Sequence, residues 1–180
     1  MKNSNKYKKY ITEVPDFPVE GISFKDISQL LGSGSMFRLA LFDMLKDYHP
    51  SEKIRSVDMF AGVESRGFLI ASGLSCVHGG GILMIRKPGK LPPPVAHKRY
   101  FLEYGQDSLE VQPNTEESTK SVVLVDDVLA TGGTLKASYE LLATNGYKVK
   151  GIAVMIDLLY LHEKDFSIGG LPIHSVIKYE

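Results

Sequence analysis

The chain has 180 residues, of which 43% are hydrophobic and 23% charged, and its 21 basic residues balance 21 acidic ones. This length and composition are typical of one soluble α/β domain, and a net charge of zero gives no reason to expect affinity for nucleic acid or membranes. No apolar run approaches the roughly 20 residues of a membrane span, the start of the chain does not resemble a secretory signal, and the single cysteine excludes an internal disulfide. We therefore expect a cytoplasmic protein.

The beginning of the chain predicts two helices with a loop between them. Residues 5–14 have an amphipathic pattern that predicts a short helix, and the prolines of the 15–18 segment end it because proline cannot continue a helical hydrogen-bond ladder. After a loop through 21–26, apolar residues at helical spacing predict a second helix over 33–48.

The rest of the chain alternates predicted strands with predicted helices, which is the order of an α/β protein with a parallel sheet. We expect strands at 57–61, 81–85, 122–125, 149–156 and 173–177, with helices at 67–77 and 133–145. The 122–125 segment is continuously apolar, as in strands that are buried on both faces of a sheet. The expected fold is a central, mostly parallel sheet flanked by helices.

A long interval between residues 86 and 121 is rich in proline, glycine and charged residues. No regular element is predicted there. Long loops in so compact a chain commonly serve as lids or binding loops, and we expect that role here.

The most informative segment is 122–134, where a buried strand meets two acids and then a loop of small residues that opens a helix. Ligands bind beyond the carboxyl ends of parallel strands, so Asp126 and Asp127 are expected at that edge, where they can accept hydrogen bonds from hydroxyls or help hold a hard cation. The small loop residues let a phosphate approach backbone amides at a helix N-terminus. They are Ala130, Thr131, Gly132, Gly133 and Thr134.

A purely structural role for this segment is less favoured. Two acids after a strand could simply cap the next helix, with the glycines as an ordinary turn, but the complete string favours a phosphate loop. Lys136 is misplaced for a Walker A motif, and the glycines at 32 and 34 lack the dinucleotide-binding spacing. An ATPase and a dehydrogenase are therefore disfavoured.

The 122–134 segment resembles the motif by which type I phosphoribosyltransferases bind 5-phosphoribosyl 1-diphosphate (PRPP). Four further segments narrow the resemblance to the adenine-specific branch of that family. They are residues 15–27, 61–68, 86–92 and 102–105. The resemblance implies transfer of the 5-phosphoribosyl group from PRPP to N9 of adenine, which gives AMP and diphosphate in purine salvage, with Mg²⁺ as cofactor. It also implies one domain over 1–180, divided into a base-binding hood (1–32) and a core (33–180) with a flexible lid loop at about 87–108.

The resemblance implies a role for each matching PRPP residue. Residues 130–134 hold the 5′-phosphate, while Asp126 and Asp127 contact the ribose hydroxyls or Mg²⁺-bound water. The diphosphate is bound by Glu64, Ser65, Arg66, Arg86, Lys87, Lys90 and Tyr104, and Arg66 also acts in catalysis by stabilising the departing charge. From the residues alone, a structural ion pair is the less favoured alternative for Arg66, whereas a solvated loop is the more ordinary interpretation of the basic segment.

Adenine needs apolar surfaces on its two faces and polar groups at its edge. The resemblance implies Phe24 and Leu158 for the faces, and backbone groups near Ser23 and Lys25 for the edge. It assigns Glu103 as the catalytic general acid-base residue near N7, brought in by the lid. Taken alone, Phe24 could be a core aromatic and Glu103 a solvated loop acid.

The resemblance also implies a homodimer in which Arg86 reaches the neighbouring PRPP site. The sequence departs from the family pattern at Glu20, Lys25, Pro93 and Asp157, which affects base recognition and the lid more than the PRPP site. Two alternatives remain: a regulatory protein that binds PRPP without catalysis, and an enzyme of this fold that acts on another base. The five histidines show no ligand spacing and are expected on the surface or in loops.

Overall fold

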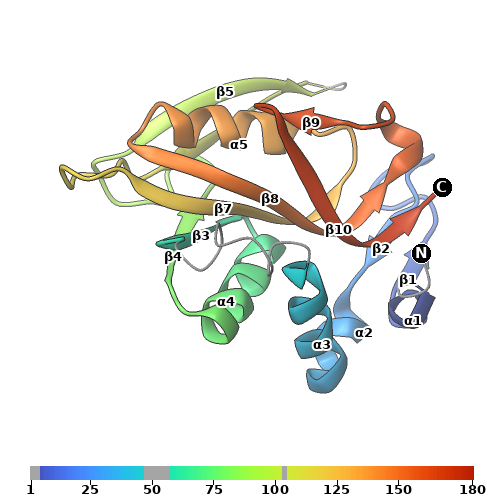
Figure 1. The fold of residues 1–180 in the computed structure, drawn as a ribbon. Coiled ribbons are helices and arrows are strands. Elements are labelled where there is room, and N and C mark those ends of the chain that lie inside the picture. Colours follow the sequence, from blue (N-terminus) through green and yellow to red (C-terminus); the bar gives the residue numbers. More distant parts are fainter. Residues whose placement is uncertain (1–4, 47–56, 103–104) are drawn as a thin grey trace.

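The computed structural model describes residues 5–46, 57–102 and 105–180. Their centre is a six-stranded sheet in the order β4-β3-β7-β8-β10-β9, in which only β9 runs antiparallel to its neighbour (Figure 1). The strands are β3 (Met59–Val63), β4 (Gly81–Ile85), β7 (Lys120–Leu129), β8 (Tyr147–Leu158), β9 (Ser167–Ile168) and β10 (Leu171–Tyr179). The predicted α/β fold with a mostly parallel sheet is confirmed.

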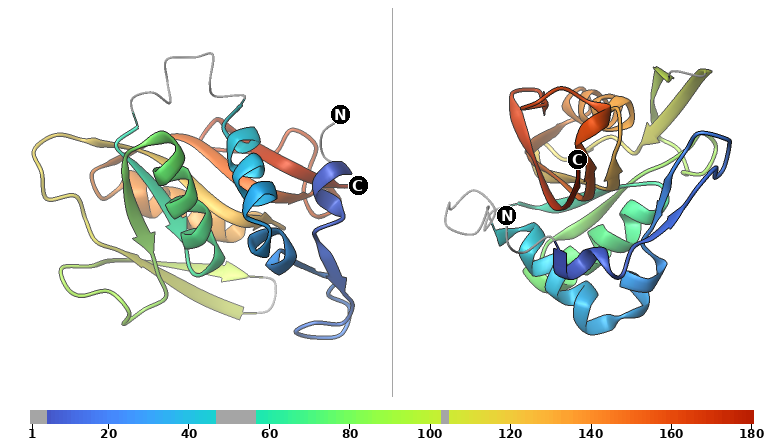
Figure 2. Two further views of the ribbon diagram at one scale, coloured as in Figure 1. Left: turned by 90° about the horizontal axis from the view of Figure 1, so that it is seen from below. Right: turned by 90° about the vertical axis from the view of Figure 1, so that its right-hand side faces the viewer.

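Helices cover both faces of this sheet. Helices α3 (Gly34–Met44) and α4 (Arg66–His78) lie against one face, and α5 (Gly133–Ala143) lies against the other (Figures 1 and 2). Successive side chains of β7 alternate between the two cores: Val123 and Val125 belong to the α4 side, whereas Val122 and Leu124 belong to the α5 side. This alternation explains why the strand is continuously apolar in sequence.

Glycines bring α4 unusually close to the sheet. A Cβ on Gly62 would lie 2.7 Å from the carbonyl oxygen of Gly67, and a Cβ on Gly67 would lie 3.0 Å from the carbonyl oxygen of Val125. Larger residues would force the helix away from β3 and β7. The N-terminus of α4, with Arg66, is thereby held against the end of β7.

The hood contains α1 (Asn5–Lys8), β1 (Thr12–Val14), β2 (Phe24–Asp26) and α2 (Ser28–Gly32). The prediction of one helix through residue 14 is wrong, because residues 12–14 form a strand that pairs antiparallel with β2. Backbone pairing with a distant segment overrides the local helical pattern, while Tyr7 and Ile11 are buried against the core.

The interval expected as an irregular lid loop contains an antiparallel hairpin, formed by β5 (Ala96–Leu102) and β6 (Gly105–Val111). The hairpin lies beside α5 in Figure 1, and Leu109 and Val111 are buried in the same core as that helix. The 3₁₀ turn η2 (Leu159–Leu161) follows β8. No helix in the described ranges is long and apolar enough to cross a membrane.

Candidate active site

The two motif acids lie inside β7 and not in the loop that follows it. The register with β3 stops at Gly62 and Val125, but the pairing with β8 continues to Leu129 and Asp157. Asp126 and Asp127 therefore project at the carboxyl edge of the sheet, where they are only 8% and 7% exposed. This is the edge at which open α/β sheets bind ligands.

Arg66 joins the hood to this edge. Its Nε lies 2.7 Å from Oδ2 of Asp127 in an ion pair, and its guanidinium carbon lies 4.7 Å from the centre of the Phe24 ring. Phe17 packs edge-on against the same ring, with the ring centres 5.2 Å apart. One arginine thus contacts both the predicted base-binding aromatic and the predicted ribose-binding acid.

The two adjacent carboxyl groups have different environments. The backbone N–H of Asp127 donates to Oδ1 of Asp126 at 2.8 Å. Burial, together with the nearby charge of Asp127, raises the pKa of Asp126 well above its ordinary value. Asp127 instead faces the Arg66 guanidinium. The raised pKa of Asp126 favours its protonated form, and the arginine lies against Asp127.

The phosphate loop, residues 130–134, wraps the N-terminus of α5. Gly132 has a φ of 83° and is the residue at the N-cap, and its carbonyl accepts the N–H of Lys136 at 2.9 Å. A Cβ on Gly132 would overlap the ring of Phe166. Both the left-handed backbone and the neighbouring ring therefore require glycine here.

The basic loop, residues 86–90, is arranged around one carboxylate. Glu64 accepts the backbone N–H of Lys87 at 2.8 Å and the ammonium of Lys90, and its Oε2 lies 3.4 Å from Nε of Arg86. Burial raises the pKa of Glu64, but these donors outweigh it and the net pKa is lowered. Arg86 also exchanges two backbone hydrogen bonds with Glu110 of β6.

A second set of contacts connects the basic loop to the phosphate loop. The ammonium of Lys87 pairs with Oδ2 of Asp107, which also accepts the Tyr100 hydroxyl at 3.2 Å. The same hydroxyl lies 3.4 Å from Oγ1 of Thr134. The hairpin is therefore a structural link between two parts of the predicted PRPP site.

The base-side residues are less closely grouped. The ammonium of Lys25 donates to Glu13 at 2.6 Å and to Ser23 Oγ at 3.1 Å, and lies over the Tyr179 ring. The Lys25 side chain is therefore held by neighbours in the hood and by Tyr179 at the end of β10. Leu158 ends β8 and is 6% exposed in the α4-side core.

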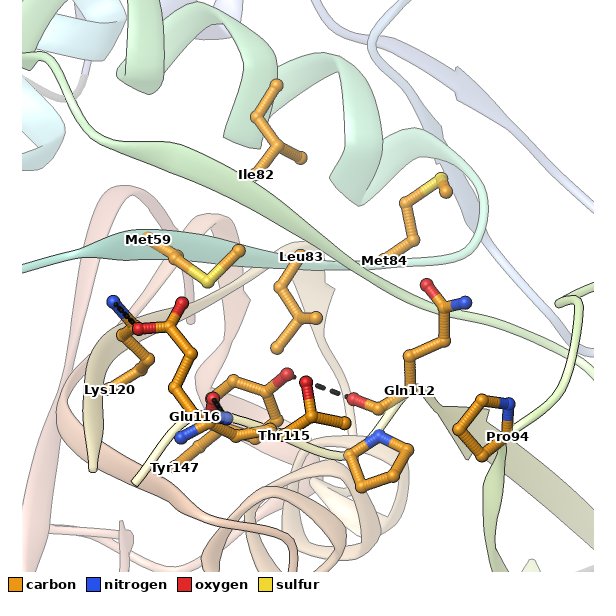
Figure 3. Close-up of a pocket in the computed structure, with 12 residues that line it drawn as sticks. Met59, Ile82, Leu83, Met84, Pro94, Gln112, Thr115, Glu116, Lys120 and Tyr147 are labelled. Atoms are coloured by element: carbon orange, nitrogen blue, oxygen red, sulfur yellow. Dashed lines mark hydrogen bonds and ion pairs between the residues drawn. The ribbon is translucent and has the colours of Figure 1, made fainter. Parts of the chain in front are cut away.

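A cavity of about 430 Å³ lies elsewhere, beside β4 and the amino ends of β3, β7 and β8 (Figure 3). Its polar groups satisfy one another: the Tyr147 hydroxyl donates to the Gln112 carbonyl at 2.9 Å, and Lys120 pairs with Glu116 at 2.7 Å. None of the motif residues lines it. The motif residues Arg66, Asp126 and Asp127 lie at the opposite edge of the sheet.

Comparison with known proteins agrees with this geometry. The sequence model of the phosphoribosyl transferase domain matches residues 41–165. The adenine phosphoribosyltransferase of Mycoplasma mobile is 43% identical over 99% of this chain and 100% of its own length. The chain belongs to the adenine phosphoribosyltransferase family.

Solved structures of adenine phosphoribosyltransferases have the same fold. The Rhodothermus marinus enzyme is 35% identical, with a TM-score of 0.86 over 98% of both chains. APRTase from Giardia lamblia, complexed with 9-deazaadenine, is 31% identical with a TM-score of 0.87 and covers 100% of this chain and 99% of its own. The family predicted from the motifs is therefore confirmed, and with it the activity of an adenine phosphoribosyltransferase.

The predicted site residues of this adenine phosphoribosyltransferase fall into three groups. Arg66, Asp126, Asp127 and Phe24 meet at the sheet edge, and residues 130–134 form the helix N-terminus beside them. Glu64 pairs with Arg86 and Lys90 of the basic loop, and the turn at 64–66 connects Glu64 to Arg66. Glu103 and Tyr104 lie outside the described residues.

The donors at the sheet edge suit Mg²⁺ held mainly by substrate. Carboxylate oxygens of Asp126 and Asp127 are the hard ligands that Mg²⁺ prefers, and phosphate oxygens and water commonly complete its shell. Within residues 5–46, 57–102 and 105–180, no group of three or more His, Cys, Asp or Glu side chains converges as a metal site. The two carboxylates therefore fit Mg²⁺ as part of a shell that further oxygen ligands complete.

Several residues near the site were not singled out by sequence. Tyr100 and Asp107 lie in a segment without a recognisable strand pattern, and Phe17 lies between two prolines. His162 and Phe166 were also missed, because neither follows a periodic or ligand-like spacing. Only the fold brings these five side chains to the motif residues.

Proposed function

We propose a residue-level mechanism in which the sheet edge of this adenine phosphoribosyltransferase binds PRPP and the hood binds adenine. The contact that carries the proposal is Arg66, which touches Phe24 on one side and Asp127 on the other. In a transfer to N9 of adenine, the base, C1′ and the departing diphosphate must lie close together. Arg66 occupies the junction of those three subsites.

The phosphate loop holds the 5′-phosphate of PRPP. Its backbone N–H groups at the start of α5, with the hydroxyls of Thr131 and Thr134, supply donors and a favourable helix dipole. The carboxylate of Asp127 accepts hydrogen bonds from the ribose hydroxyls, and the raised pKa of Asp126 limits repulsion between the acids.

The diphosphate binds cationic side chains that are paired with carboxylates in the free protein. Glu64 holds Arg86 and Lys90, Asp107 holds Lys87, and Asp127 holds Arg66. These carboxylates keep the cations ordered at the places where phosphate oxygens bind. As the C1′–O bond breaks, negative charge grows on the diphosphate and these guanidinium and ammonium groups stabilise it.

When bound, Mg²⁺ would supply a further positive charge to the departing diphosphate. Asp126 and Asp127 orient the water molecules or hydroxyls around it. The ribose becomes oxocarbenium-like in the transition state, and the Asp127 carboxylate stabilises that positive charge.

Adenine stacks on Phe24, with Leu158 toward its other face and backbone groups of Ser23 and Lys25 at its edge. The lysine side chain is engaged with Glu13, which leaves the backbone of β2 as the reading surface. Glu103 exchanges a proton with the imidazole ring of the base as N9 forms its bond to C1′. Closure of the lid excludes water that would otherwise capture the cation.

A homodimer is supported by apolar side chains exposed beside the basic loop. Ile82 and Met84 on the edge strand β4 and Leu69 on α4 are all exposed. An uncovered apolar edge strand favours association, and the guanidinium of Arg86 lies next to this surface, 5.7 Å from the Phe68 ring centre. In the dimer, Arg86 reaches the neighbouring PRPP site. The single cysteine fits a cytoplasmic location.

One assay tests the substrate assignment. The protein is incubated with PRPP, Mg²⁺ and each of adenine, hypoxanthine, guanine, xanthine and orotate, and nucleotide formation is followed by chromatography. We expect AMP from adenine and little product from the other bases. Absence of AMP with intact PRPP binding would instead support a regulatory PRPP-binding protein.

A further inference from the structure

The side chain of His162, expected as an ordinary surface or loop residue, is buried against the carboxylate of Asp157. Its Nε2 lies 2.7 Å from Oδ1 of Asp157, and both side chains are only 6% exposed. Its Nδ1 lies 3.1 Å from the carbonyl oxygen of Glu163. The other carboxylate oxygen of Asp157 accepts the Ser175 hydroxyl at 3.2 Å. The polar atoms of this pair are fully engaged.

The pair closes the turn next to the predicted adenine site. Asp157 is the residue before Leu158 at the end of β8, and η2 lies between Leu158 and His162. Asp157 is also in register with Leu129 of β7, the residue that precedes the phosphate loop. The contact between Asp157 and His162 therefore fixes the turn that follows β8. This turn lies beside the end of β7, where the phosphate loop begins.

The His162 ring has a second contact, with Phe166. The two ring centres are 5.2 Å apart and the planes are tilted by 38°. Phe166 in turn occupies the space into which a side chain at Gly132 would project. A continuous path of contacts thus runs from Leu158 through Asp157, His162 and Phe166 to the phosphate loop.

We propose that His162 is a positioning residue that couples the adenine subsite to the 5′-phosphate subsite. The inference rests on the proposed function, because it takes residues 130–134 as the PRPP phosphate loop. His162 touches neither substrate. It fixes the turn that carries Leu158 and holds Phe166 against Gly132, so that the phosphate loop is formed before PRPP arrives.

Preorganisation of this kind lowers the free-energy cost of binding, because the loop loses less conformational freedom when the phosphate enters. Removing the His162 ring frees Phe166, and removing Phe166 uncovers Gly132 directly. Both changes interrupt the same path. Their effects on PRPP affinity are therefore expected to overlap and not to add.

The test is a double-mutant cycle in which calorimetry measures the dissociation constant of PRPP with Mg²⁺. The proteins are wild type, His162→Ala, Phe166→Ala and the double variant, each checked for folding by circular dichroism. We expect each single variant to weaken binding about tenfold, equivalent to about 1.4 kcal/mol, and the double variant to be little weaker than either. Unchanged affinity in the singles, or a loss of about a hundredfold in the double variant, would overturn the proposal.

His162→Gln separates positioning from stability. The amide keeps a donor for Asp157 but lacks the ring that contacts Phe166. We expect this variant to regain most of the melting temperature lost in His162→Ala while PRPP binding stays weak. Recovery of both properties together would mean that His162 serves stability alone. The exposed Lys148→Ala variant, at the amino end of β8, is the control and should leave PRPP affinity unchanged, whereas failure of the wild type to bind PRPP would contradict the proposed function instead.

Discussion

Nε of Arg66 forms an ion pair with Oδ2 of Asp127 at 2.7 Å, which joins the first residue of α4 to the end of β7. The contact depends on the glycines that let α4 approach the sheet. It leaves the other guanidinium nitrogens of Arg66 available as a planar fork for phosphate oxygens. The same guanidinium lies against Phe24, so its orientation is held from two sides.

Replacing this fork should impair catalysis severely. We expect Arg66→Lys to lower kcat/KM for PRPP by about 100- to 1,000-fold, because an ammonium cannot pair with Asp127, cover Phe24 and bind two phosphate oxygens at once. Steady-state kinetics would measure the change. Arg38→Lys on the exposed side of α3 is the matched control, and a loss of less than about tenfold in the Arg66 variant would remove Arg66 from the diphosphate site.

Gly132→Ala should damage stability and binding together. The left-handed backbone costs a non-glycine residue about 1–2 kcal/mol, and overlap with Phe166 adds about 1–3 kcal/mol. Urea denaturation should therefore show a loss of about 2–5 kcal/mol in the free energy of unfolding. Gly170→Ala shares the positive φ but meets open space, so it should lose only the backbone contribution and keep PRPP affinity.

Asp126 should make the free protein less stable as the pH rises. Burial raises its pKa, so the folded state binds more protons than the unfolded state between the two pKa values, and the free energy of unfolding falls as pH rises through that window. We expect Asp126→Asn to flatten this decline and to raise the melting temperature at neutral pH, while PRPP binding weakens. Melting temperatures from about pH 4 to 8 would measure it. Parallel profiles for the two proteins would contradict the assignment.

Glu103→Gln should separate turnover from binding. An amide cannot exchange the proton at N7, so kcat should fall by about 100- to 10,000-fold while the dissociation constant of PRPP changes little. Single-turnover kinetics and calorimetry would measure the two quantities. Glu117→Gln, at an exposed acid, is the control. Normal turnover in the Glu103 variant would exclude the acid-base role.

Local patterns predicted the central architecture well. The 122–125 strand, the 67–77 helix and the 81–85 strand appear within a few residues of their expected positions, because burial on both sheet faces leaves a continuous apolar pattern and helices carry helical spacing. The same patterns failed at β1 and in the β5–β6 hairpin. Those strands are short or highly charged, and they exist because of pairing between segments.

The sequence by itself determined the chemistry of this protein wherever a motif is contiguous, as in the two acids followed by a small-residue loop. Contacts between side chains from different elements, or across a turn, could be identified only from the tertiary structure. They include the contact of Arg66 with Phe24, that of Tyr100 with Thr134, and the burial of His162 against Asp157. Chain order encodes periodicity and local loop geometry. The distances between elements are fixed only when the two cores pack against the sheet. That packing determines which charged side chains face each other at the edge of the sheet.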